Sequence, residues 1–92
     1  MVTWKKLREE LELTEEEERI IELEKNLILT MVRIREEQGL TQTQLAHLCD
    51  LKQPTIARME SASHSPQLDS FLRVLVPLGY TLQIVPIKKG DR

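Results

Sequence analysis

Two histidines and one cysteine are the side chains of this 92-residue chain best suited to hold a metal ion. His47 and Cys49 stand two positions apart in a predicted helix and therefore face different ways, while His64 lies in a predicted loop. A structural zinc site needs four converging ligands, so we expect no metal and no cofactor. The Glu residues fall mostly on predicted exposed helix faces with no apolar pocket to tune them, so we expect no enzymatic activity.

The stretch 35–60 has the pattern of two short helices joined by a tight turn. Thr41 and Gln44 form a Thr-x-x-Gln capping box, which predicts that a short helix begins there. Asp50 marks the turn, because Asp tolerates the left-handed backbone region better than most residues. Pro54 fits the first turn of the next helix, where its missing N–H would have no partner within the helix. This order of elements is the sequence form of a helix-turn-helix.

Apolar residues separate the inner face of the second short helix from its outer face. Ile56 and Met59 are expected to point inward, so Gln53, Thr55 and Arg58 are expected to point outward. From spacing alone, Gln53 and Arg58 could also be ordinary solvated side chains.

A long helix is predicted before this stretch. Thr14 and Glu17 form a second capping box, and Gly39 is placed to end the helix after about Gln38. Its length leaves open a break near Leu23–Asn26. The predicted inner face consists of Ile20, Leu23 or Glu24, Leu27, Ile28, Met31 and Ile34. Before it, Thr3 is expected to cap a short helix whose thin apolar stripe is Trp4, Leu7 and Leu11, packed either in the core or at an interface.

A fourth helix and one strand are predicted after the stretch. Ser65-Pro66 is expected to start the helix, with Ser as the cap and Pro at the first position, and Gly79 to end it. The predicted inner face is Leu68, Phe71, Leu72, Leu75 and Leu78. Residues 80–85 alternate and are rich in β-branched and aromatic types, which predicts a strand, and Pro86 limits its pairing beyond that point.

A single strand leaves its backbone N–H and C=O groups without a ladder partner. The simplest partner is the same strand of a second copy, antiparallel about a two-fold axis. We therefore expect a homodimer joined through Tyr80, Leu82 and Ile84. Packing of the strand on its own subunit, or on a different protein, is the alternative.

Composition limits the remaining choices. The length allows one domain, no apolar run approaches the roughly 20 residues of a membrane span, and no signal segment opens the chain, so we expect a cytoplasmic protein with no membrane partner. A single cysteine agrees with a reducing compartment. Residues 1–38 carry 7 Lys and Arg against 11 Glu, a net charge of −4, whereas residues 39–92 carry a net charge of +2. Any surface that faces DNA should lie in the second part, and the acidic first part either suits a basic partner or is simply solvated.

The stretch 35–60 resembles the Cro/C1-type (Xre) helix-turn-helix family. The matching residues are Gly39-Leu40-Thr41-Gln42, Leu45-Ala46, Gln53, Ile56, Glu60, Ser65-Pro66 and Leu68. With the acidic arm, Gln53–Arg58 and Leu78–Leu82, the chain from Thr14 to Pro86 resembles HigA-type antitoxins. The implied fold is mainly α: an acidic helical arm over residues 1–24, then a DNA-binding domain over residues 25–92 that ends in a dimerisation strand.

The resemblance implies an antitoxin of a type II toxin–antitoxin system. Such antitoxins bind and neutralise a HigB-type, RelE-like mRNA-cleaving toxin and repress their own operon at a palindromic double-stranded DNA site. Two other interpretations stay open: a Cro/C1-type transcriptional regulator with no toxin partner, and a protein-interaction module with a degenerate DNA face.

The resemblance also assigns site residues. It implies base reading by Gln53, Pro54, Thr55 and Arg58, and phosphate contacts by Thr41, Gln42, Thr43, Lys52, Ser63 and His64. Arg35 and Glu60 match an ion pair of the family. The candidates for toxin contact are Trp4, Leu7, Leu11, Ile20 and Leu27. The chain departs from the family at Asp50 and Ala62, where the family commonly has Gly.

Overall fold

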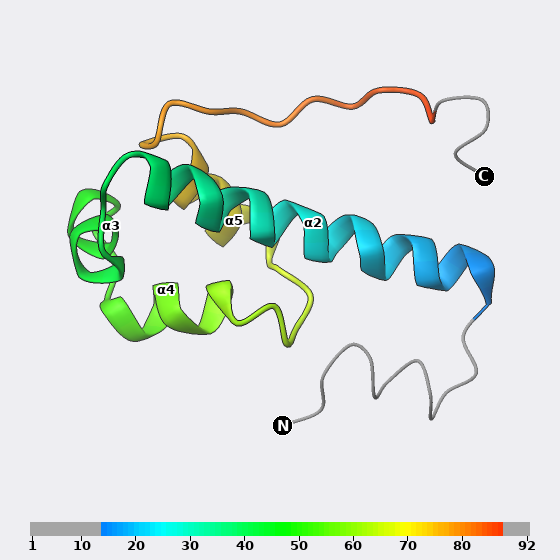
Figure 1. The fold of residues 1–92 in the computed structure, drawn as a ribbon, viewed down its shortest axis with the longest axis horizontal. Helices are drawn as coiled ribbons and strands as arrows, with labels where there is room; N and C mark the ends of the chain where they lie inside the picture. The colour runs from blue at the N-terminus through cyan, green and yellow to red at the C-terminus, as the bar shows by residue number, and fades with distance from the viewer. Residues whose placement is uncertain (1–13, 88–92) are drawn as a thin grey trace.

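The computed structural model describes residues 14–87 of the chain. This part contains four helices, which are α2 (Glu15–Glu37), α3 (Gln42–Leu48), α4 (Gln53–Glu60) and α5 (Leu68–Leu75). Helix α2 runs the length of the molecule, and α3, α4 and α5 gather around its C-terminal part, so that its N-terminal part projects beyond them (Figure 1). The predicted division between residues 24 and 25 falls inside α2.

Helix α2 begins and ends as its sequence predicts. The Thr14 hydroxyl accepts a hydrogen bond from the Glu17 backbone N–H at 3.1 Å, and the Glu17 carboxylate accepts one from the Thr14 N–H at 3.2 Å. Gly39 follows the helix with φ +71°. The helix is continuous over 23 residues, so the break considered near Leu23–Asn26 does not occur. No Gly or Pro interrupts this sequence, and the i→i−4 hydrogen bonds therefore continue through it.

The predicted inner face of α2 is correct in its C-terminal half and wrong in its N-terminal half. Ile28, Met31 and Ile34 are buried, as expected. Toward the N-terminus Ile21 is buried, whereas Ile20 is 51% exposed and Leu27 is 37% exposed. The projecting part of the helix has few neighbours, so apolar spacing alone does not determine which of its side chains are covered.

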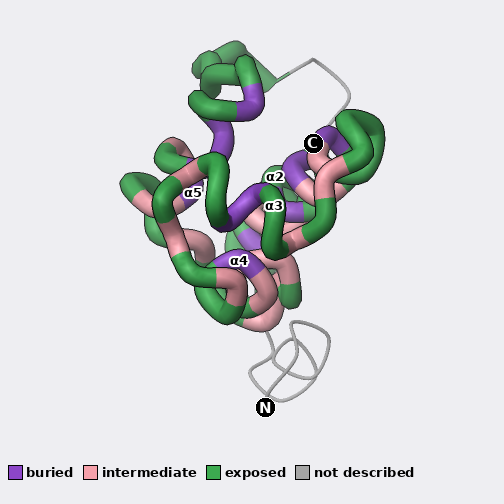
Figure 2. The backbone as a smooth tube through the Cα atoms, turned by 90° about the vertical axis from the view of Figure 1, so that its left-hand side faces the viewer, coloured by how far each residue is buried: buried purple, intermediate pink, exposed green. Residues whose placement is uncertain are grey.

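The core lies where the four helices meet, and Figure 2 shows buried positions on their facing sides. Its largest fully buried side chains are Ile28, Met31, Leu45, Ile56 and Val74. Met59, which is expected to point inward, packs against this cluster, and so does Cys49; both side chains are partly buried. Val74 was absent from the predicted inner face of the last helix, whose first predicted member, Leu68, is exposed.

Helix α5 starts later than predicted. It begins at Leu68 after Gln67, and no side chain caps it. The Ser65 hydroxyl instead donates a hydrogen bond of 3.2 Å to the carboxylate of Glu24 on α2. This bond accompanies a loop that crosses toward α2, so the backbone at Ser65 and Pro66 does not enter the helix that their pairing predicts.

The chain after α5 is extended and exposed. Gly79 has φ +94°, and the Tyr80 N–H donates to the Leu75 carbonyl at 3.1 Å. Residues 80–87 then run back along α2 toward its N-terminal end (Figure 1). The described residues contain no strand, because a strand needs a ladder partner. Pairing of residues 80–85 across a dimer stays a prediction.

Within residues 14–87, no helix is both long and apolar enough to cross a membrane.

Candidate nucleic-acid interface

Helices α3 and α4 are held at a fixed angle by local backbone features. The Thr41 hydroxyl accepts from the Gln44 N–H at 3.1 Å, and the Gln44 side chain accepts from the Thr41 N–H at 2.8 Å, which completes the predicted capping box. Asp50 adopts φ +56° in the turn, as predicted. Pro54 lies in the first turn of α4. Leu45 of α3 and Ile56 of α4 are both completely buried, so the apolar contact between them fixes the outward face of α4.

The outward face of α4 carries polar side chains. Pro54, Thr55 and Arg58 are exposed, and Gln53 is half-buried at the start of the helix. Each of the four residues that the resemblance assigned to base reading is therefore at least partly accessible at the surface of the helix-turn-helix. Gln53 is half-buried because its side chain is hydrogen-bonded to Gln42.

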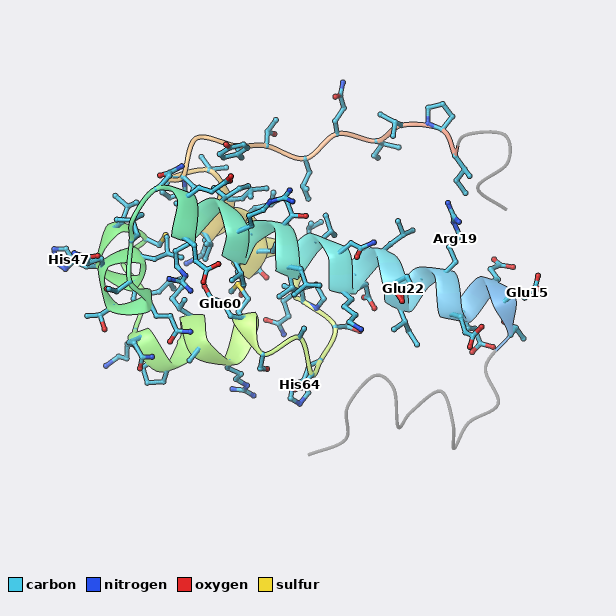
Figure 3. The ribbon with its side chains drawn as sticks, viewed as in Figure 1. Glu15, Arg19, Glu22, His47, Glu60 and His64 are labelled. Carbon is cyan, nitrogen blue, oxygen red and sulfur yellow. The ribbon has the colours of Figure 1, made fainter. Side chains whose placement is uncertain are left out.

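A chain of hydrogen bonds ties Gln53 to the body of the protein. The Gln53 Nε2 group donates to the Gln42 Oε1 at 2.8 Å, and the Gln42 Nε2 group donates to the Glu60 Oε1 at 2.9 Å. Glu60 is in turn held by Arg35, through Nε–Oε2 at 2.6 Å and a second bond to Oε1 at 3.0 Å. The remaining guanidinium nitrogen of Arg35 donates to the Leu40 carbonyl at 2.7 Å. We call this set the Arg35–Gln53 relay; Figure 3 labels Glu60 at its centre.

The relay sets the direction of each amide. The ionised carboxylate of Glu60 only accepts hydrogen bonds, so Gln42 presents its NH2 group to Glu60 and its oxygen to Gln53. Gln53 must then donate one N–H to Gln42, which leaves its oxygen and its second N–H for an outside partner. Sequence reasoning placed Gln42 on phosphate and missed this bridging position, because no short-range spacing links residues 35, 42, 53 and 60.

The other residues that the resemblance assigned to phosphate are dispersed around α4. Thr41 and Thr43 stand at the start of α3, Lys52 precedes α4, and His64 lies in the loop after it, all four exposed. Ser63, in the same loop, is half-buried. Ala62 of this loop adopts φ +54°, a left-handed conformation in which Gly would be unstrained.

A groove of about 370 Å³ lies beside Arg58 and His64, between α4 and the start of α5. Gln67 and Ser70 also line it. No sequence pattern pointed to Gln67 or Ser70, because these residues come near α4 only through the course of the loop. The groove brings neutral and basic hydrogen-bonding groups together beside the outward face of α4.

The candidate metal ligands do not converge. Figure 3 shows His47 on the outer side of α3 and His64 in the loop after α4, far from each other. Among the residues described, no group of three or more His, Cys, Asp or Glu could hold a metal ion. Burial raises the pKa of the Cys49 thiol, and its sulfur lies 3.9 Å from the Val74 carbonyl oxygen. Cys49 therefore has the surroundings of a packing residue, since a nucleophile needs a lowered thiol pKa.

The residues expected at partner interfaces are exposed where they are described. Ile20 lies on the projecting part of α2, and Leu27 lies further along the helix, toward α5. Trp4, Leu7 and Leu11 lie outside the described residues. Tyr80, Leu82 and Ile84 are all exposed, and Ile84 makes no burying contact at all.

Comparisons with known proteins agree with this geometry. A family profile described as helix-turn-helix matches residues 32–85. An uncharacterised HTH-type transcriptional regulator of Haemophilus influenzae is 40% identical over 85 residues, which cover 92% of this chain and 86% of that protein. The chain belongs to the helix-turn-helix family of transcriptional regulators, whose members are typically DNA-binding proteins rather than enzymes.

A solved structure is also similar over nearly the whole chain. It is a toxin–antitoxin module from Streptococcus pneumoniae, with a TM-score of 0.66 and 38% identity, and the match covers 96% of each chain. The similarity therefore extends beyond the helix-turn-helix to the projecting helix and the C-terminal segment.

Proposed function

We propose that this protein is a cytoplasmic antitoxin of a type II toxin–antitoxin system. It neutralises a HigB-type, RelE-like mRNA-cleaving toxin by direct binding and represses its own operon by sequence-specific binding to double-stranded DNA. The observation that carries the DNA part is the outward edge of α4, on which Thr55 and Arg58 are exposed and Gln53 is held by the Arg35–Gln53 relay.

The chemistry of this edge suits bases in the major groove. Gln pairs bidentately with adenine by accepting from N6 and donating to N7, which are the two functions the relay leaves free on Gln53. Arg58 suits guanine, Thr55 suits a base edge or a thymine methyl group, and Pro54 suits a thymine methyl group. We assign the phosphate contacts to Thr41, Thr43, Lys52, Ser63 and His64, and we assign the Gln42 side chain to positioning Gln53.

The toxin part of the proposal rests on the projecting end of α2. Its first turn carries Glu15, Glu16, Glu17 and Glu18, and Ile20 is exposed beside them. A toxin that cleaves RNA needs a basic surface to hold its substrate, and an acidic surface with apolar anchors complements it. The similarity to a solved toxin–antitoxin module supports this assignment.

We further propose that the protein is a homodimer joined through Tyr80–Val85. A symmetric dimer would present two copies of α4 to a palindromic operator with half-sites about 34 Å apart. The exposed, extended segment after Gly79 supports this arrangement.

Gel shifts with DNA from upstream of the protein's own gene test the DNA part. Wild-type protein should bind one sequence preferentially, and Gln53→Ala and Arg58→Ala should each lose about 1–3 kcal/mol of discrimination at one base pair. Gln42→Ala should lose discrimination at the same base pair as Gln53→Ala, while Thr43→Ala should weaken all sequences alike. Equal binding to unrelated DNA by wild-type protein would favour an interaction module with a degenerate DNA face.

A plain transcriptional regulator is the second candidate, favoured by the Haemophilus influenzae relative. Coexpression with the protein of the neighbouring gene separates the two candidates. If the protein is an antitoxin, it should copurify with a small basic protein and should restore the growth of cells that express that protein. Ile20→Glu should weaken both the copurification and the restoration of growth. Specific DNA binding without any such partner would favour the plain regulator.

A further inference from the structure

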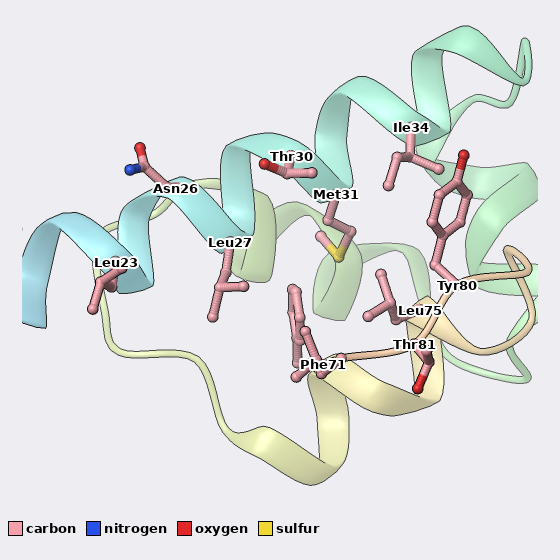
Figure 4. Close-up of a pocket in the computed structure, with 11 residues that line it drawn as sticks. Leu23, Asn26, Leu27, Thr30, Met31, Ile34, Phe71, Leu75, Tyr80 and Thr81 are labelled. Carbon is pink, nitrogen blue, oxygen red and sulfur yellow. The ribbon is translucent and has the colours of Figure 1, made fainter. Parts of the chain in front are cut away.

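A groove separate from α4 lies between α2, α5 and the start of the C-terminal segment. Its volume is about 420 Å³, and Figure 4 shows the side chains that surround it. Met31, Phe71 and Leu75 form the part nearest the core. The other lining residues come from α2, Leu23 and Leu27 among them, and from the segment 80–82. None of them is charged, so the groove suits an apolar occupant rather than an ion or a charged metabolite.

One border of the groove also offers backbone groups. Tyr80 N–H is bonded to Leu75, but within residues 14–87 no backbone hydrogen bond joins residues 81–87 to another segment. Such a border accepts an extended chain that can complete a ladder. The occupant that satisfies both the border and the groove is therefore an extended strand with apolar side chains at alternate positions.

We infer that the groove receives the C-terminal segment of a second copy of this chain, with the partner's Ile84 as the side chain that enters it. The inference rests on the proposed homodimer and specifies how the two copies meet. Residues 80–87 are themselves an extended segment with apolar side chains at Leu82 and Ile84. Ile84 is 101% exposed, so it has no place to pack within its own subunit.

Two-fold symmetry allows both copies to make this contact at the same time. In an antiparallel pair with the two-fold axis at Leu82, Tyr80 of one copy faces Ile84 of the other on the same side of the ladder. Tyr80 and Leu82 border the groove, so each copy would place its Ile84 against the groove of the other. The segment that borders the groove in each copy thus also carries the side chain that fills the groove of the other copy, as an isologous interface requires. Leu27 then contacts the second copy rather than a toxin.

The main test measures oligomeric state by analytical ultracentrifugation of the full chain across micromolar concentrations. Ile84→Glu should raise the dimer dissociation constant by at least about 100-fold, because two buried isoleucines are replaced by charges. Ile84 is fully exposed in one subunit, so helix content by circular dichroism should not change. Leu29→Glu is the matched control: Leu29 is an exposed apolar residue of α2 outside the groove, and its variant should remain a dimer.

A second measurement tests the register. In a Cys49→Ser background, Leu82→Cys should form a disulfide between two copies under mild oxidation, since a residue on the axis faces its own copy. Leu29→Cys should not. The inference is overturned, and the proposed homodimer is retained, if the Ile84→Glu variant is still a dimer or if Leu82→Cys forms no disulfide between two copies. A monomeric wild-type protein overturns both. Loss of toxin binding by Ile84→Glu in an intact dimer would assign the groove to the toxin and overturn the inference.

Discussion

The carboxylate of Glu60 accepts hydrogen bonds from two other helices. Arg35 reaches it from α2 and Gln42 reaches it from α3, while Glu60 itself ends α4. Its side chain is only 6% exposed and that of Arg35 only 12%. One buried carboxylate therefore contributes both to stability and to the orientation of a residue proposed to read a base.

Removal of this carboxylate should strongly destabilise the fold. We expect Glu60→Ala to lower the free energy of unfolding by about 3–5 kcal/mol, because it leaves the Arg35 guanidinium buried without its charged partner. Urea unfolding followed by circular dichroism measures the change. Glu36→Ala, at an exposed position of α2, should cost no more than about 0.5 kcal/mol. Equal effects of the two substitutions would show that the ion pair contributes nothing.

The starts and ends of helices and the turns could be predicted from the sequence where the interactions that produce them are local. Both capping boxes and the left-handed Gly39 and Asp50 lie within four residues of the groups they serve, so spacing alone locates them. The start of α5 could not be predicted, because Ser65 bonds to Glu24 on a distant helix. The Arg35–Gln53 relay was predicted only in its ion pair, and only through a family resemblance. The strand at residues 80–85 depends on a partner that a single chain does not contain.

The loop between α4 and α5 stores backbone strain at Ala62. Its φ of +54° lies in the left-handed region, which costs a side chain about 1–2 kcal/mol relative to the right-handed one. We expect Ala62→Gly to raise the free energy of unfolding by about 0.5–1 kcal/mol, since part of the relief is offset by the greater freedom of Gly in the unfolded chain. Thermal unfolding measures the change.

The matched control for Ala62 is Ala57, which lies inside α4. There, Gly should lower stability by about 1 kcal/mol, because a helix interior disfavours it. If Ala62→Gly and Ala57→Gly both lowered the free energy of unfolding, the strain relieved at Ala62 would be smaller than the stability lost through the greater freedom of Gly in the unfolded chain.

Along the whole sequence, charge is divided between the two parts of the chain. The first 38 residues carry a net charge of −4 and the rest a net charge of +2, so DNA binding must rely on a few well-placed cations. Lys52 stands just before α4 and is exposed.

The salt dependence of DNA binding reports how many of these cations contact phosphate groups. We expect Lys52→Ala to reduce the slope of log K against log salt concentration by about 1 for each copy bound, because one phosphate contact releases about 0.9 of a counterion. Fluorescence anisotropy over a salt series measures the slope. Gln53→Ala should weaken binding to the specific site without changing the slope. An unchanged slope for Lys52→Ala would remove Lys52 from the phosphate contacts.

The continuity of α2 has a mechanical consequence. Its 23 residues span about 34 Å, from the acidic turn at Glu15 to the end that carries Arg35. Because the helix is unbroken, it tilts as one rigid rod. A tilt of about 10° about its Arg35 end therefore displaces its Glu15 end by about 6 Å. The packing of the C-terminal half of α2, to which the Arg35–Glu60 ion pair contributes, therefore determines where a protein bound to the acidic turn would stand relative to α4.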